Sequence, residues 1–411
     1  MATFPVKIIE NILEHVYSQY KPLETPYNLH QCALVSHTWR AISHSLIFFE
    51  LLLSEGREER VKALLGAQNG HLRQYVRKAW IEDHKGQEFI EEFLNSLPNV
   101  QGLYVLHGGS LKLISMESPV PETTLKNLTS LGLSMVASFP VQAFYSCHSL
   151  RELKTNESTF EVDIKIQHSF PGCSPISSLD SLRVTGDELS NMRILEWMLT
   201  PQCPFDLRAL TTLRIADRSD ELRAYEWAAE IVRLCTSTLR DLMIDPPTSL
   251  AVEDPQVTTE SLLYSSALSN LRVVTISIIQ EIKDYTSYIP WMKAFFSCLP
   301  VPNRLEEIHI PCLFTHRTPD SEDAHIAADM PLYGWEAFDA ILTSSEFRLK
   351  RVVFGIYGLG KPSRPEALRS LLRESLPGLN RNGVLEVVGS KEYGYISEED
   401  RWWYIKPVGV L

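Results

Sequence analysis

The chain has 411 residues, which is too long for one simple core and implies two or more structural units. Apolar residues make up 44% of it and charged residues 22%, a balance typical of globular proteins and unlike that of disordered ones. The net charge of −12 at pH 7 disfavours binding along a nucleic-acid backbone, which usually requires a basic excess.

The sequence also indicates the cellular compartment of the protein. Met1–Lys7 lacks the basic and apolar stretches of a secretory signal, and no apolar run approaches the ~20 residues of a membrane span. The seven cysteines are odd in number and form no CxxC pair, so we expect reduced thiols in a core. These features predict a cytoplasmic or nuclear protein without a membrane partner.

The N-terminus predicts a helix that begins at Pro5, where the missing N–H of proline costs nothing. Its apolar residues recur at helical spacing and form a broad stripe, which contains Ile8, Ile9, Ile12, Leu13 and Val16. Pro22 and Pro26 then end the helix and indicate a loop.

Two further helices complete this segment. A short helix fits Leu29 to Val35, and Ser36 can cap a third helix that carries Trp39, Ile42 and Leu46. Three helices in some forty-five residues form little core, so the segment gains most by burying its remaining apolar surface on a partner or on the next domain.

Residues 4–49 resemble the F-box, whose usual form is Leu-Pro-x-Glu-Ile-Ile followed about 25 residues later by Cys-x-Leu-Val-Ser-Arg-x-Trp-Arg. The chain departs from this form at Phe4, Lys7 and His37. The positions that match are Pro5, Ile8, Ile9, Leu13, Cys32, Leu34, Val35, Ser36, Trp39 and Arg40.

F-box proteins bind the Skp-type adaptor of cullin–RING ubiquitin ligases and present substrates to it. The resemblance therefore implies a set of adaptor contacts among Pro5, Ile8, Ile9, Leu13, Leu34, Val35 and Trp39. One helical residue cannot serve two faces, so we expect roughly half of these to touch the adaptor and half to hold the helices together. Lys7 replaces the usual glutamate and alters the polar contact expected there.

Beyond residue 70 the pattern apolar-x-x-apolar-x-apolar recurs. Its clearest copies start at Leu179, Leu210, Leu239 and Leu271, which gives a period of about 30 residues. The other copies start at Val76, Val100, Leu128, Leu305 and Leu349, with weaker ones at Leu150 and around Leu385. This period and spacing are typical of leucine-rich repeats, in which the last two apolar positions share one face of a strand.

Helix-like segments alternate with these strands. They are Gly86–Leu97, Glu188–Leu199, Glu221–Leu234, Trp291–Leu299, Trp335–Leu342 and Pro365–Leu376. The fold class predicted is α/β, with a three-helix F-box at residues 1–50 and an irregular leucine-rich-repeat solenoid at residues 51–411, strands inside and helices outside. The acidic stretch Thr315–Met330 is predicted to be an exposed loop.

The residue between the last two apolar positions of each repeat should point to the inner face. Three successive repeats place Lys154, Arg183 and Arg214 there, on strands about 4.8 Å apart. Arginine suits carboxylate and phosphate groups, so these residues predict a site for an acidic or phosphorylated substrate segment. Alternatively, they are solvated or paired with acids such as Glu152, Asp180 and Asp241.

The sequence gives little support for nucleotide binding, metal binding or nucleophilic catalysis. Gly355–Lys361 matches seven positions of a phosphate-binding loop, but Pro362 replaces the required Ser or Thr, so a glycine-rich turn is expected. His30, Cys32, His37 and His44 would not converge on one metal, and Cys147-His148 lacks a third catalytic member. No metal and no cofactor are predicted.

These observations favour a non-catalytic substrate-recognition subunit of an SCF-type cullin–RING ligase. One alternative is a repeat scaffold or sensor whose helices only cap the solenoid, since terminal repeats expose apolar edges. Another is an enzyme with a site in a repeat loop.

Overall fold

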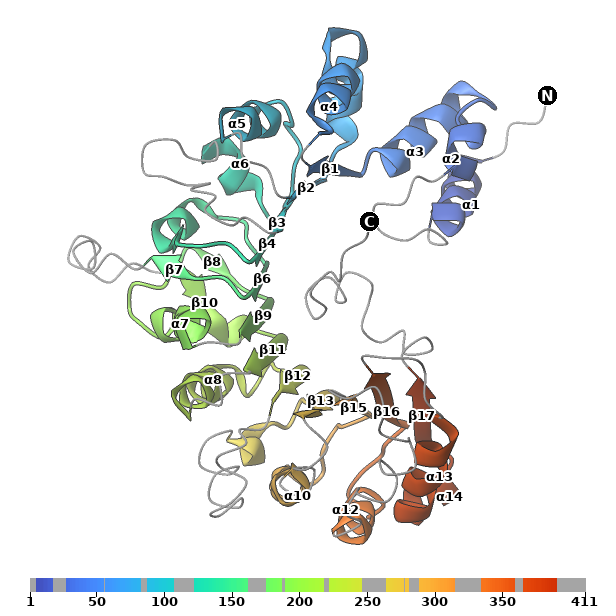
Figure 1. The fold of residues 1–411 in the computed structure, drawn as a ribbon, viewed down its shortest axis with the longest axis vertical. Coiled ribbons are helices and arrows are strands. Elements are labelled where there is room, and N and C mark those ends of the chain that lie inside the picture. Colours follow the sequence, from blue (N-terminus) through green and yellow to red (C-terminus); the bar gives the residue numbers. More distant parts are fainter. Residues whose placement is uncertain are drawn as a thin grey trace, which may run out of the picture. The chain divides into compact units, whose positions relative to one another are not determined.

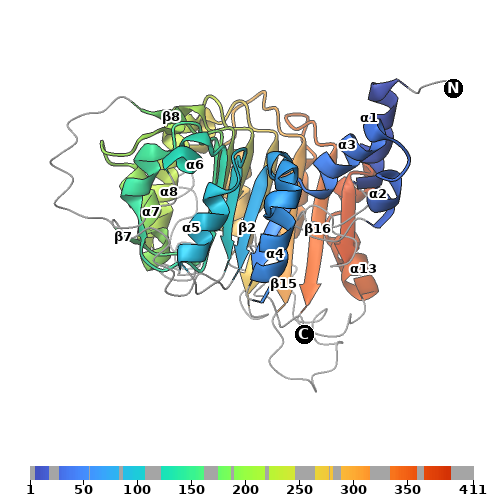
Figure 2. The same cartoon turned by 90° about the horizontal axis from the view of Figure 1, so that it is seen from above.

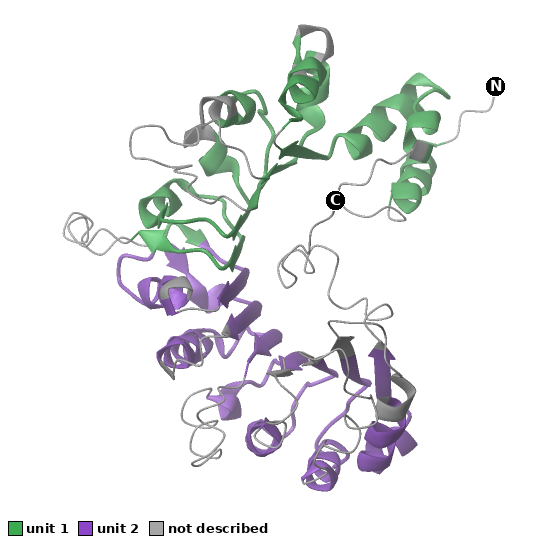
Figure 3. Cartoon of the chain, viewed as in Figure 1, with its two compact units in different colours: residues 1–177, 396–411 green, residues 178–395 purple. Residues whose placement is uncertain are grey.

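The computed structural model describes residues 5–17, 27–54, 56–82, 87–106, 122–161, 175–186, 189–217, 222–245, 264–276, 278–280, 288–314, 334–358 and 365–389. It divides into two compact units, each described by itself below (Figure 3). Unit 1 comprises Met1–Ser177 with Ile396–Leu411, and unit 2 comprises Ser178–Tyr395. The predicted loop Thr315–Met330 lies outside the described residues.

Unit 1 begins with three helices, which we call the helical module: α1 (Val6–Tyr17), α2 (Tyr27–Cys32) and α3 (His37–Ile47). The Ser36 hydroxyl caps α3 by accepting a hydrogen bond from the Trp39 backbone N–H at 3.3 Å, as predicted. The second helix ends at Cys32, three residues before the predicted end, because Leu34 and Val35 form a turn.

The module has a small core of its own. Ile9, Leu13 and Leu29 are buried at its centre and join α1 to α2. Partly buried side chains surround them: Val16, Tyr17, Cys32, Trp39, Ile42, Leu46 and Ile47.

Five parallel strands follow in unit 1 and pair in chain order. They are β1 (Glu50–Ser54), β2 (Lys78–Glu82), β3 (Gly102–Leu106), β4 (Ser130–Ser134) and β6 (Glu152–Asn156). Three helices lie along one face of this sheet: α4 (Glu58–Leu65), α5 (Gln87–Asn95) and α6 (Glu122–Asn127) (Figures 1 and 2). The described part of unit 1 also contains two 3-10 helices, η1 (Ala67–Tyr75) and η2 (Val141–Ser146), and a short strand pair, β5 (Phe139–Pro140) with β7 (Phe160–Glu161).

Unit 2 repeats the arrangement with strands of four to eight residues. Its parallel sheet runs through β9 (Ser181–Gly186), β11 (Thr212–Asp217), β12 (Asp241–Ile244), β13 (Val273–Ile276), β15 (Glu307–Phe314), β16 (Arg351–Gly358) and β17 (Leu385–Gly389). A further strand, β14 (Ile278–Gln280), pairs with β15, and β8 (Ser177–Ser178) pairs with β10 (Phe205–Asp206). The helices are α7 (Leu189–Met198), α8 (Leu222–Cys235), α10 (Tyr288–Ser297), α12 (Trp335–Leu342), α13 (Pro365–Ser375) and α14 (Pro377–Arg381).

The core lies between the strands and the helices in each unit. Every position of the repeat pattern that starts at Leu210, Leu239 or Leu271 is buried, including Leu213 and Ile215 of β11. Aromatic residues extend this core in unit 2, where Trp291 stacks on Phe295 at 5.4 Å between ring centroids. The predicted α/β solenoid, with parallel strands on one side and helices on the other, is therefore confirmed.

Two local predictions need correction. The first repeat strand, β1, was missed, because the apolar run through Leu53 follows α3 directly and obscures where the helix ends. The expected glycine-rich turn at Gly355 is wrong as well, because β16 runs through to Gly358 and pairs with β15 along its whole length. The rest of that predicted loop, 359–361, lies outside the described residues.

Candidate protein-binding surfaces

The helical module exposes a cluster of large apolar side chains. In the part of the chain that the structure describes, six large apolar residues are exposed, and only Val301 lies outside the module. Leu34 and Val35 are 72% and 65% exposed in the turn between α2 and α3. We call the exposed module residues the apolar surface; they are Val6, Ile8, Ile12, Leu34 and Val35.

Helix α1 carries two apolar stripes, of which one is buried and the other is exposed. Ile9 and Leu13 are four residues apart, face one way and are buried against Leu29. Ile8 and Ile12 have the same spacing on an adjacent face and are exposed. The stripe is too broad for one short neighbouring helix to cover, so half of it remains available to another surface.

The predicted adaptor residues divide along these stripes. Pro5, Ile8, Leu34 and Val35 are exposed and can meet a partner without any rearrangement. The other three are internal: Ile9 and Leu13 are buried, and Trp39 is half-buried against the module core. Whether the exposed four touch an adaptor stays a prediction.

Arg40 positions the turn that carries the exposed pair. Its Nε donates a hydrogen bond to the backbone carbonyl of Ala33 at 3.2 Å, directly before Leu34 and Val35. The sequence marks Arg40 only as a residue that matches the F-box form, and nothing in its spacing reveals this contact. Lys7, in contrast, is 76% exposed and pairs at 3.5 Å with Glu10, a surface ion pair of the kind that contributes little.

Helix α3 joins the module to the repeats of unit 1. The His44 ring, near its end, packs edge-on against Phe48 and Tyr75 and lies 6.4 Å from the His71 ring of η1. Burial lowers the pKa of His44, and the nearby His71, Arg40 and His30 lower it further. The attachment therefore uses the end of α3, whereas the apolar surface lies on α1 and on the α2–α3 turn.

The strand register confirms the predicted row of side chains on the inner face of each sheet. We call inner row the residues between the two buried apolar positions of each strand. In unit 1 these are Leu52, Trp80, Tyr104, Gly132 and Lys154. In unit 2 they are Arg183, Arg214, Met243, Thr275, His309, Val353 and Glu386.

The inner row of unit 1 is a closed network. Trp80 stacks on Tyr104 at 4.3 Å between ring centroids, and both are buried. Lys154 is buried too: its ammonium lies 3.1 Å from Glu152 and 5.7 Å from the centre of the Tyr104 ring. The Ser130 hydroxyl donates to Glu152 at 2.8 Å and lies 2.8 Å from the Tyr104 hydroxyl. Lys154 is therefore neutralised within unit 1.

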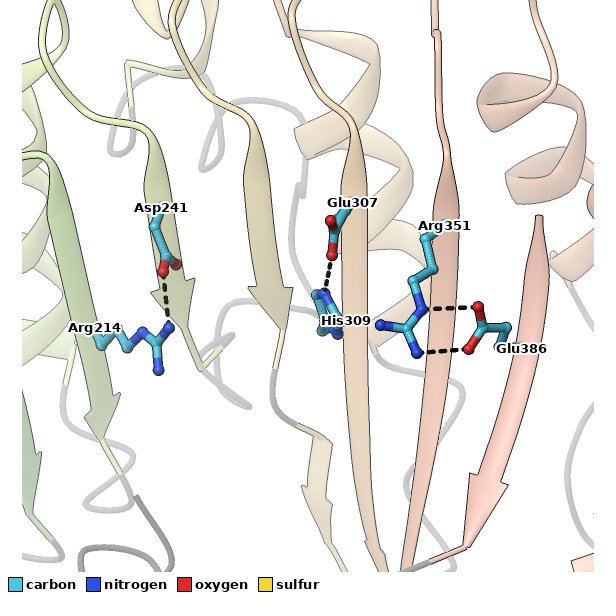
Figure 4. Close-up of polar contacts among 6 residues, drawn as sticks. All are labelled: Arg214, Asp241, Glu307, His309, Arg351 and Glu386. Atoms are coloured by element: carbon cyan, nitrogen blue, oxygen red, sulfur yellow. Dashed lines mark hydrogen bonds and ion pairs between the residues drawn. The ribbon is translucent and has the colours of Figure 1, made fainter. Parts of the chain in front are cut away.

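The inner face of unit 2, which comprises the inner row and the side chains beside it, carries more charge than that of unit 1. Arg183 and Arg214 face each other in register on β9 and β11, as predicted, and Arg214 donates to Asp241 at 2.8 Å (Figure 4). Farther along the sheet, His309 lies 3.1 Å from Glu307. Arg351 donates two hydrogen bonds to Glu386, at 2.8 and 2.6 Å (Figure 4). Acids and bases thus lie side by side on this face and form ion pairs.

The structure describes several of the groups considered for catalysis or metal binding. Burial raises the pKa of the Cys147 thiol to about 12, so it stays protonated at neutral pH. Across the described ranges, no three His, Cys, Asp or Glu side chains are placed to hold one metal ion. Within the same ranges, no helix has both the length and the apolar character that spanning a bilayer requires.

The chain is similar in structure, but not in sequence, to known proteins. No family model matches it, and no curated protein matches it. Among solved structures, it is similar to the leucine-rich repeat-containing protein LegL7 from Legionella pneumophila, with a TM-score of 0.38 and 13% sequence identity. The match covers 87% of this chain and 97% of that one. The assignment to a leucine-rich-repeat-like fold rests on the strand register and helix placement of this chain, and such a fold is typical of a protein-binding scaffold.

Proposed function

We propose that the chain is the substrate-recognition subunit of an SCF-type cullin–RING ubiquitin ligase. The helical module would bind a Skp-type adaptor, and the repeats would hold a protein substrate near the ubiquitin-charged enzyme. The contribution of the chain is proximity, which converts an encounter between two proteins into a reaction within one complex. The observation that carries the proposal is the apolar surface of the module.

The energetics of exposure support a partner for this surface. Burying one large apolar side chain is worth about 1.5–3 kcal/mol, and five such residues remain uncovered in a segment of some forty-five residues. Exposed apolar residues gathered on one small segment, such as the neighbours Leu34 and Val35, are typical of interaction sites. The residues that the F-box resemblance assigns to the adaptor include Ile8, Leu34 and Val35, which belong to this surface.

The capping alternative accounts for less of the geometry. A cap would use its apolar residues to cover the end of the sheet, yet Leu34 and Val35 remain exposed and α3 makes the attachment through His44. The observation that favours a capping contribution is this attachment itself. The two functions are compatible, because different faces of the module serve them.

Capture by an immobilised Skp-type adaptor tests the proposal. We expect the intact chain to be retained, and the double variant Leu34→Glu, Val35→Glu to be lost. The matched control is Val301→Glu, because Val301 is also large, apolar and 62% exposed but lies in unit 2. Circular dichroism of each variant checks that it folds. Equal retention of all three proteins, or of none, would contradict the proposal.

A further inference from the structure

Three large side chains on the inner face of unit 1 are buried. Trp80, Tyr104 and Leu106 are 1%, 3% and 3% exposed and form one cluster, against which Leu52 packs. They alternate along β2 and β3 with the core positions that face the helices, so they lie on the opposite face of the sheet (Figure 1). Rings that stand side by side on a bare sheet cover each other's faces but leave their outer edges in water. Burial as complete as this therefore requires a cover over the inner face.

Two buried polar atoms at the same face have no hydrogen-bond partner among the described residues. The Glu50 side chain is 9% exposed; its Oε1 lies 3.1 Å from the Lys78 ammonium, whereas its Oε2 is buried and unpaired. The Trp80 Nε1–H is buried and donates to no acceptor. A buried polar atom without a partner is costly, and a charged one more so. The pair therefore calls for a hydrogen-bond acceptor beside Trp80 and a donor beside Glu50.

One extended peptide segment can satisfy both atoms. Glu50 of β1 is in register with Lys78, which lies two residues before Trp80 on β2. The strand spacing and the rise per residue place the Cα atoms of Glu50 and Trp80 roughly 8 Å apart. A peptide advances about 3.4 Å per residue, so groups two or three residues apart on it span this distance. Aromatic side chains on the peptide would cover the edges of the Trp80 and Tyr104 rings.

The chain contains a segment of this chemistry in the same unit. Ile396–Leu411 belongs to unit 1. Of the parts of unit 1 outside the described residues, it alone contains more than one aromatic residue. Its aromatic residues, Trp402 to Tyr404, are consecutive and are flanked by the cations Arg401 and Lys406. We call residues 401–406 the aromatic segment.

We propose that the aromatic segment docks on the inner face of unit 1 across β1, β2 and β3. Its rings pack against Trp80, Tyr104 and Leu106, one of its cations pairs with the free oxygen of Glu50, and one of its backbone carbonyls accepts from the Trp80 indole. The chain thus occupies its own inner face at these strands, and another protein binds there only by displacing the segment. This contact goes beyond the proposed ligase function and does not depend on the adaptor.

Thiol labelling of the full-length chain tests the contact. Leu52→Cys is placed in the otherwise unmodified chain and in a chain that also carries Trp402→Ser, Trp403→Ser and Tyr404→Ser. We expect the thiol at position 52 to react about tenfold faster in the second chain, measured by mass spectrometry of the labelled peptides. Val301→Cys, at an exposed residue of unit 2, is the matched control and should react at the same rate in both chains. Equal rates at position 52 would overturn the inference.

A peptide supplied separately provides a second measurement that needs no change at Leu52. A fluorescent peptide of residues 398–411 should bind the full-length chain with the three serine substitutions at least tenfold more tightly than the unmodified chain. The reason is that the attached segment competes at a high effective concentration. Equal affinities, or no binding to either chain, would overturn the inference.

A matched pair of substitutions in the chain with the three serines localises the peptide. Glu50→Gln keeps the size of the side chain and removes its charge, so we expect peptide affinity to fall about tenfold. Glu92→Gln makes the same change at an exposed residue of α5, on the helical side of the sheet, and should leave affinity unchanged. Circular dichroism checks that each variant folds. Equal affinities of the two variants would overturn the inference.

Discussion

Helix α1 buries Ile9 and leaves its neighbour Ile8 exposed, whereas strand β11 of unit 2 buries both Leu213 and Ile215. In the repeats that start at Leu210, Leu239 and Leu271, every apolar position of the pattern is buried, because each repeat is covered by the next. The module has only two short helices with which to cover α1. The difference shows that the module exposes apolar residues because its three helices are too few to bury them. A surface outside the module must cover these residues.

The largest expected effect is a difference in stability between variants of the buried stripe and of the exposed stripe of α1. We expect Ile9→Ala to lower the free energy of unfolding of the module by about 3 kcal/mol, since it leaves a cavity in a small core. Ile8→Ala should lower it by less than about 0.5 kcal/mol, since Ile8 is exposed. Pulse proteolysis in urea, with cleavage followed at residues 5–47, measures both. Similar losses for the two variants would show that the stripes are not distinct.

The same pair of residues should behave in the opposite way in binding. Ile8→Ala removes apolar area that a partner would cover, so we expect adaptor affinity to fall about tenfold, which corresponds to about 1.4 kcal/mol. Isothermal titration with the purified adaptor measures this loss. An affinity equal to that of the unmodified chain would remove α1 from the proposed interface.

Acidification should destabilise unit 2 through the buried His309. Histidine in an unfolded chain has a pKa of about 6.5, and burial lowers the pKa of His309 in the folded state. As pH falls through 6.5 the unfolded chain takes up a proton that the folded chain does not, so the stability of unit 2 falls until the lowered pKa is reached. Above pH 6.5 the effect is absent.

Urea midpoints of unit 2 between pH 8 and pH 5 measure this dependence, with His309→Gln as the comparison. The variant should have a shallower decline below pH 6.5 than the unmodified chain. Parallel declines would assign the dependence to other groups, among them His44 at the junction of the module with the repeats, whose pKa burial also lowers.

Substitution of Lys7 should have the smallest effect on adaptor affinity and on stability. Its ion pair with Glu10 is exposed, so Lys7→Ala should change adaptor affinity by less than about threefold and should leave stability unchanged. A change of tenfold or more, by titration, would mean that the adaptor contacts this position directly.

The repeat strands could be predicted because three apolar positions at fixed spacing determine a strand, its buried face and its register together. The same spacing occurs in Phe48, Leu51 and Leu53, and this signal could have revealed β1. It was obscured because α3 ends immediately before it and contributes apolar residues to the same run.

The candidate sites could be predicted only in part. Ile8 and Ile12 have the same helical spacing as Ile9 and Leu13, so the sequence alone cannot decide which pair contacts Leu29. The burial of Lys154 depends on Glu152 of the same strand and on side chains of two neighbouring strands. Such networks follow from register and side-chain orientation, which composition does not determine.

Hydrogen exchange of backbone amides in the intact chain, with and without a purified Skp-type adaptor, tests the central claim most directly. We predict that the adaptor slows exchange in α1 and in the segment that links α2 to α3, and leaves the amides of β11 and β12 unchanged. Identical exchange in the helical module in both samples, at adaptor concentrations that saturate an established F-box protein, would contradict the account.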